Sequence, residues 1–185
     1  MRYVQTLLFI GGSLALGFCA FVYFNAAIYQ AREDRDLERT LHLAGPNVPR
    51  APEGLQVTRL EIPRIDLSVM VLEGVQAGTL GKGAGHIPGT AFPNDAGNVG
   101  IAAHRDSFFR KLRNIRTNDQ VTLTTLQGSY QYAVDWTRVV EPTDVSVLSP
   151  SSDRILTLVT CYPFYYVGPA PQRFIVRAHR VITRF

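Results

Sequence analysis

The chain has 185 residues, of which 46% are apolar and 18% charged, so it is long enough for one ordinary domain with a real core plus an appendage. The net charge of +4 is spread thinly, without basic runs interleaved with aromatic residues, which argues against a nucleic-acid partner. The two cysteines, Cys19 and Cys161, show no zinc-ligand spacing and lie in segments too different for a disulfide. We predict no cofactor, and calcium dependence stays open because no carboxylate cluster compels it.

The N-terminal segment is uncharged from Tyr3 to Ala31. About twenty consecutive apolar residues are what a bilayer core of about 30 Å requires, and no good signal-peptide cleavage site follows them. We therefore predict an uncleaved membrane anchor over residues 1–31. Only Arg2 precedes this span whereas three arginines follow it closely, a bias that favours a cytoplasmic body, although long domains translocate despite it.

Beyond the anchor the chain divides into a polar stalk and one folded unit. Residues 32–44 are charged and are predicted to extend the span as a short solvated helix. Residues 45–54 hold three prolines and two glycines and are predicted to be a linker. The stalk then covers 32–54, and residues 55–185 form a single domain.

This domain contains short β-type runs bounded by turn signals. The predicted strands are 57–62, 67–74, 98–104, 121–127, 130–136, 154–161 and 173–182. Gly128-Ser129 is predicted to be a two-residue hairpin turn, and residues 79–84 and 106–115 short helices. Strands at this spacing indicate a mainly β fold, either a small barrel or a sandwich.

Cys161 ends an apolar run that Tyr162-Pro163 breaks, and Arg173 opens the next predicted strand. If these strands pair in antiparallel fashion, a permanent cation lies opposite a thiol, at a Cβ separation of about 4.5–5.5 Å. Arg173 alternates away from the apolar side of its strand, so it is equally explained as part of a solvated face.

A thiol needs a base or a stabilised thiolate to attack a carbonyl at neutral pH, and histidine is the usual partner. His42, in the polar stalk, and His179, beside arginines, are predicted to face solvent. His86 and His104 both follow glycine-rich sequence, and His104 caps an apolar strand. The residues alone do not choose between these two, and either is compatible with a structural role.

The segment Thr157–Cys161, TLVTC, resembles the TLxTC signature of sortases. His104, at the end of an earlier predicted strand, and Arg173, at the start of the strand after the cysteine, match the histidine and arginine of that family in order and spacing. The membrane anchor followed by one β domain also fits. The segments GHIPGTAFPNDAGNVGIAAHRDSFF and LTLVTCYPFYYVGPAPQRFIVRA are most similar to class D sortases, and the resemblance covers essentially residues 55–185.

The resemblance implies a sortase-type closed β-barrel of about eight strands with short helices, and a cysteine transpeptidase activity. Cys161, as thiolate, would attack an LPxTG-like sorting motif of a protein substrate and form a thioacyl enzyme. His104, as imidazolium, would protonate the departing amine and then help to deprotonate the incoming one. Arg173 would donate hydrogen bonds to the substrate backbone or the developing oxyanion. The acceptor amine implied is a peptidoglycan precursor or a pilin lysine.

Other roles are implied less directly. The backbone N–H of Thr160 is expected to assist at the substrate, and His86 to lie near it. Tyr165 and Tyr166 are expected in the substrate groove, or alternatively to pack their loop against the barrel. The body is expected on the extracytoplasmic side of a bacterial plasma membrane, with a single membrane pass. Two alternatives stay open: a hydrolase with the same site, and a non-enzymatic membrane-anchored binding module with an unreactive Cys161.

Overall fold

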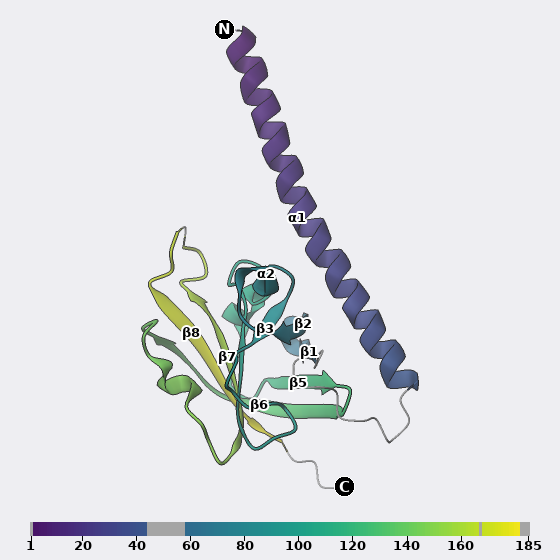
Figure 1. Ribbon diagram of the computed structural model, residues 1–185. Coiled ribbons are helices and arrows are strands. Elements are labelled where there is room, and N and C mark those ends of the chain that lie inside the picture. The colour runs from purple at the N-terminus through teal and green to yellow at the C-terminus, as the bar shows by residue number, and fades with distance from the viewer. Residues whose placement is uncertain (1, 44–57, 167, 182–185) are drawn as a thin grey trace.

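The computed structural model describes residues 2–43, 58–166 and 168–181 (Figure 1). Its eight strands are β1 (Thr58–Ile62), β2 (Leu67–Glu73), β3 (Ala84–His86), β4 (Gly97–Ala102), β5 (Gln120–Thr125), β6 (Gly128–Val140), β7 (Arg154–Tyr162) and β8 (Gln172–Arg180). They form a closed barrel in the order β1-β2-β3-β4-β7-β8-β6-β5. The β2–β3 and β4–β7 pairs are parallel and the others antiparallel. The helices are α1 (Arg2–Leu43), α2 (Ala77–Leu80) and the 3-10 turns η1 (Pro63–Ile65), η2 (Arg110–Asn114) and η3 (Val145–Leu148).

The prediction of a mainly β closed barrel of about eight strands is confirmed, and each of the seven predicted runs forms a strand. Three local predictions were wrong. The helix predicted over 79–84 is shorter and earlier, and the strand β3 begins where it was to end. Within 106–115 only the short turn η2 forms. Gly128 and Ser129 belong to β6, because Thr125 pairs with Gly128 and the two-residue turn falls at 126–127.

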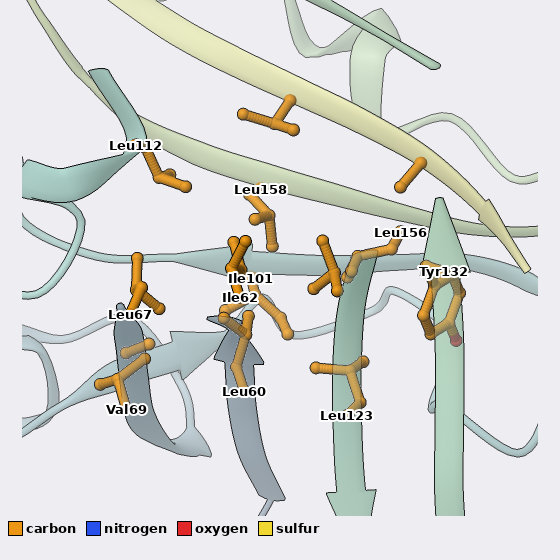
Figure 2. Close-up of a cluster of buried hydrophobic side chains, with 14 of the residues drawn as sticks. Leu60, Ile62, Leu67, Val69, Ile101, Leu112, Leu123, Tyr132, Leu156 and Leu158 are labelled. Carbon is orange, nitrogen blue, oxygen red and sulfur yellow. The ribbon is translucent and has the colours of Figure 1, made fainter. Parts of the chain in front are cut away.

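Alternate side chains of the strands fill the barrel, as a two-residue period requires. Figure 2 shows this interior, in which the labelled residues are Leu60, Ile62, Leu67, Val69, Ile101, Leu112, Leu123, Tyr132, Leu156 and Leu158, all at most 4% exposed. Each fully buried aliphatic side chain contributes about 1.5–3 kcal/mol of transfer free energy. Leu112 comes from η2, so the segment after β4 closes one end of the barrel over this core.

The two faces of β7 have different surroundings. Leu156 and Leu158 point into the core, so Thr157 and Cys161 point outward. The β6–β7 connection covers part of this outer face, because the Val147 carbonyl accepts hydrogen bonds from Asn98 at 3.0 Å and from Thr157 at 3.4 Å. Thr157 is fully buried under this cover, whereas Cys161 is only half-buried. The outer face is therefore open toward the end where β7 finishes.

The N-terminal helix α1 has an apolar part and a part that packs on the barrel. The segment Arg2–Arg39 is long and apolar enough to cross a membrane. Near the C-terminal end of this same segment, the Gln30 amide accepts from the Met70 N–H at 2.7 Å, and Arg59 forms ion pairs with Asp34 at 2.9 Å and Glu38 at 3.1 Å. Burial alone lowers the pKa of Arg59, but these partners more than offset that effect and the pKa is raised.

The helix predicted over 32–44 is confirmed as far as Leu43. It is not merely solvated, however, because Leu37 is buried, at 3% exposed. The linker predicted over 45–54 and the domain start at residue 55 lie outside the described residues, and the described barrel begins at Thr58.

Candidate active site

Cys161 and Arg173 lie directly opposite each other on β7 and β8, which confirms the predicted antiparallel opposition. The register that pairs them also pairs Val159 with Ile175 on the same outer face. The Arg173 guanidinium donates to the carbonyls of Ala170 at 3.3 Å and Gln172 at 3.0 Å. These bonds hold the guanidinium of this cysteine-paired residue at the base of the β7–β8 connection.

His104 reaches the same place from the neighbouring strand. The parallel β4–β7 ladder pairs Ala102 with Val159, and the Ala103 N–H donates to the Val159 carbonyl at 3.2 Å. The same offset, continued two residues past the end of β4, brings His104 level with Cys161. His104 is exposed, and within the described part of the chain no hydrogen bond or ion pair engages its ring. The ring nitrogens are therefore available to a substrate.

Thr160 supports this arrangement from inside the barrel. Its side chain is buried, at 2% exposed, and its hydroxyl donates to the Ala103 carbonyl at 2.7 Å. This bond joins the residue before the cysteine to the residue before the histidine. The hydroxyl thus fixes the relative position of β4 and β7, and the role predicted for the Thr160 backbone N–H stays a prediction.

The aromatic residues after Cys161 divide into two groups. Phe164 packs edge-on against Phe174, at 5.3 Å between ring centroids, and so attaches the connection to the barrel. Tyr165 and Tyr166 are 77% and 47% exposed. Substrate contact through these two tyrosines stays a prediction, but Tyr165 does not pack its loop against the core.

His86 lies elsewhere, inside the barrel on β3. It is 6% exposed, its Nδ1 lies 2.9 Å from Glu73 Oε2, and its Nε2 lies 3.0 Å from both the Ala91 carbonyl and Thr90 Oγ1. Its ring stacks on Phe92 at 4.7 Å. The structure does not bring His86 to the Cys161 group, and its predicted substrate contact stays untested.

One residue that the sequence did not single out connects the two sides of the site. The Arg105 Nη2 donates to the Tyr166 carbonyl at 2.7 Å and to the Gly168 carbonyl at 3.0 Å. Arg105 directly follows His104, so the bonds tie the histidine segment to the loop between Cys161 and Arg173. The sequence offers one signal for this residue, which is a basic side chain directly after a candidate histidine. Its partners are backbone carbonyls in a loop distant in sequence, and such acceptors leave no pattern in the sequence.

The arrangement suits acyl transfer. A thiol, an imidazole and a guanidinium come from three neighbouring strands at one end of the barrel, as nucleophile, general acid–base and oxyanion donor require. In the described ranges, no group of three or more His, Cys, Asp and Glu residues is placed to hold a metal ion.

Comparisons with known proteins agree with this geometry. The family model described as "Sortase domain" matches residues 60–181. Sortase D of Bacillus subtilis (strain 168) is 37% identical over 123 residues, covering 66% of this chain and 62% of that protein, so the match spans less than two thirds of that relative.

Solved structures share the fold. A Sortase D5 transpeptidase of Clostridium perfringens superposes with a TM-score of 0.67 at 24% identity, covering 85% of this chain and 98% of that one. Sortase C of Streptococcus pneumoniae, described for its catalysis and pilin substrate specificity, gives a TM-score of 0.64 at 25% identity over 80% and 90% of the two chains. The chain belongs to the sortase family.

Proposed function

We propose that this protein is a membrane-anchored transpeptidase that cleaves an LPxTG-like sorting signal and transfers the acyl fragment to an amine. The observation that carries the proposal is the meeting of Cys161, His104 and Arg173 at one end of the barrel. Membership of the sortase family supports the same reaction.

In the first half-reaction the Cys161 thiolate attacks the carbonyl carbon of the scissile peptide bond. A C–S bond forms, and the carbonyl oxygen takes the negative charge. Arg173 is the residue that pairs with Cys161 across the two strands, and its guanidinium donates hydrogen bonds to that oxygen or to the adjoining substrate backbone. Collapse breaks the C–N bond, and His104 gives its proton to the leaving amine, which leaves a thioester on Cys161.

In the second half-reaction an acceptor amine takes the place of the released fragment. Neutral His104 accepts a proton as the amine attacks the thioester carbonyl, a new C–N bond forms, and the Cys161 thiolate departs. The acceptor is a peptidoglycan precursor or a pilin lysine, and a related Streptococcus pneumoniae sortase is described for pilin specificity. Tyr165 and Tyr166 would contribute to the groove through which these chains reach the thiol.

Product analysis separates transfer from hydrolysis. The full chain in detergent is incubated with LPxTG-type and LPxTA-type peptides, with and without a lysine-bearing pilin-type peptide or a peptidoglycan stem peptide. An amine-ligated product supports the proposal. Cleavage with water as the only acceptor, in the presence of every amine, would favour a hydrolase. No reaction, combined with a Cys161 that resists alkylation in the folded protein, would favour a binding module.

The catalytic domain is proposed to lie on the extracytoplasmic side of a bacterial plasma membrane, anchored by the apolar helix α1 in a single pass. Family membership supports this side, although the arginines after the span favour the opposite one. A membrane-impermeant thiol reagent tests it in intact cells. Labelling of wild type but not of Cys161→Ala supports the proposed side, and labelling that requires cell lysis contradicts it.

A further inference from the structure

The end of the barrel that carries the catalytic group lies next to the point where α1 leaves its apolar segment. Gln30 is among the last uncharged residues of that segment, and its amide donates to the Lys82 carbonyl at 2.5 Å. Lys82 lies just before β3, which begins at the end of the barrel where β4 finishes, since Gly85 pairs with Ala102. His104 follows that same end of β4.

Several contacts fix the barrel in this orientation on α1. The Gln30 side chain also accepts from the Met70 N–H, and Asp34 and Glu38, one helical turn apart, both pair with Arg59. Leu37, between them, is buried against the domain. Figure 1 shows the β7–β8 connection and α2 at the end of the barrel nearest the N-terminal half of α1. An apolar helix that crosses a bilayer therefore turns the catalytic end toward it.

That end has the composition of a membrane interface. Residues 105–116 carry five basic residues and one acidic residue, Asp106. The net charge of this segment is therefore +4, the same as that of the whole chain. Beside them lie the exposed rings of Tyr165 and Tyr166, with the Arg113 guanidinium 5.4 Å from the Tyr165 ring and Arg105 5.8 Å from the Tyr166 ring. Tyrosine is enriched at the headgroup level, and clustered Arg and Lys are attracted to anionic lipid.

We propose that this membrane-facing rim, formed by Tyr165, Tyr166 and the basic segment 105–116, rests on an anionic lipid surface. The inference rests on the proposed insertion of α1 in a bilayer and specifies which face of the domain meets that bilayer. The side chain of Cys161 then lies close to the membrane surface.

The test uses the full chain in bilayers, with one thiol at a time carrying a fluorophore that brominated acyl chains quench. The rim reporter is Tyr165→Cys in a background of Cys19→Ser and Cys161→Ala. The matched control is Val145→Cys in the same background, because Val145 is apolar and 71% exposed but lies on η3, whose Val147 carbonyl contacts Thr157. A third sample keeps the native Cys19 as the reporter of α1.

Four results are expected. The label at Cys19 is quenched in phosphatidylcholine bilayers with or without phosphatidylglycerol. The label at position 165 is quenched more strongly when phosphatidylglycerol is present, and the label at 145 stays unquenched in both. The pair Arg110→Gln and Arg113→Gln, placed in the rim reporter, reduces quenching at 165 in the anionic bilayer toward its level in the neutral one.

The unfavourable outcomes are distinguishable. Quenching at Cys19 without quenching at 165 would overturn the proposed rim and leave the anchor intact. No quenching at Cys19 would overturn the anchor itself. Equal quenching at 165 and 145 would show that the barrel has no preferred face toward the lipid. Equal quenching at 165 in neutral and anionic bilayers would refute the role given to the basic segment.

Discussion

His86 lies on β3 and His104 follows the neighbouring strand β4, and each comes after a glycine-rich stretch of sequence. His86 is enclosed in the barrel, with Glu73 on one ring nitrogen and Thr90 on the other, whereas His104 is exposed at the end of β4. The antiparallel β3–β4 register sets His86 opposite Ile101, three residues before His104, a displacement of about 10 Å along the strands.

The difference between the two histidines comes from register and not from local sequence. The parallel β4–β7 ladder brings only the later histidine level with Cys161, and the hydroxyl of Thr160 fixes that ladder. A buried histidine whose two ring nitrogens are hydrogen-bonded stabilises a fold. An exposed histidine whose ring nitrogens have no partner is available for proton transfer near a thiol. The substitutions of the two histidines test this division of roles, and two further substitutions test the oxyanion donor and an ion pair at the same end of the barrel.

His104→Asn is expected to have the largest effect. Loss of a general acid–base typically costs about 10²–10⁴-fold, so kcat/KM for transfer should fall by that factor while the melting temperature changes little. Ligation kinetics and thermal unfolding on the same preparation check both parts. Activity within a few fold of wild type would assign proton transfer to another group.

Arg173→Lys is expected to lower kcat/KM by about 10²-fold, because an ammonium does not reproduce the fixed fork of guanidinium donors. The matched control is Arg177→Gln, which removes a cation from the same outer face of β8, farther along the strand and under the β6–β7 connection. Steady-state kinetics should separate the two. An equal loss of kcat/KM in both variants would show that the positive charge of this face matters for the reaction, and not a hydrogen-bond donor held at the Arg173 position.

His86→Leu is expected to reduce stability instead of catalysis. Glu73 and Thr90 lose their buried partner, so the free energy of unfolding should fall by about 1–3 kcal/mol. Activity per folded molecule should stay close to wild type. Chemical denaturation gives the first quantity and active-site titration of Cys161 the second. A large loss of activity without a loss of stability would contradict a structural His86 and support its predicted contact with substrate.

Asp119→Asn is expected to have the smallest effect, with a dependence on pH. The hydrogen bond from Arg64 lowers the pKa of Asp119 more than burial raises it. A carboxyl with a lowered folded-state pKa stabilises the protein above its unfolded value, near 3.9, and loses that contribution as pH falls. At neutral pH the free energy of unfolding of wild type should exceed that of the variant by about 1 kcal/mol. The difference is small because Arg64 is partly exposed to solvent. Denaturation at several pH values should show the difference shrinking below about pH 4. A difference that does not change with pH would refute the ion pair.

Much of the barrel was predictable from sequence because alternation and turn residues are local signals. The strand β3 was missed because it has three residues, and β6 runs beyond Trp136 because β8 pairs with it as far as Val140. Packing of α1 was also missed. Asp34 and Glu38 read as solvent-facing charges, since their partner Arg59 lies in β1, beyond the predicted linker.

The residues of the candidate site were predictable to different degrees, because local sequence signals reveal contacts only between segments that are close in sequence. A single short connection joins Cys161 to Arg173, so their opposition followed from spacing and strand alternation. The residues alone did not distinguish His104 from His86 as the catalytic histidine, and only the resemblance to sortases did. The β4–β7 register decides which histidine lies near Cys161, and it joins segments that are distant in sequence. Arg105 binds backbone carbonyls, which have no signature in sequence.

The Cys161 thiol is expected to carry the acyl fragment as a thioester, and intact-protein mass spectrometry detects that adduct. The full chain is mixed with an LPxTG-type peptide without acceptor, beside Cys161→Ala and, as the matched control, Cys19→Ser. Wild type and Cys19→Ser should gain the mass of the acyl fragment, lose it on addition of an amine and release the ligated product, and Cys161→Ala should gain nothing. Peptide turnover or an acyl adduct that persists in Cys161→Ala would show that Cys161 is not the nucleophile.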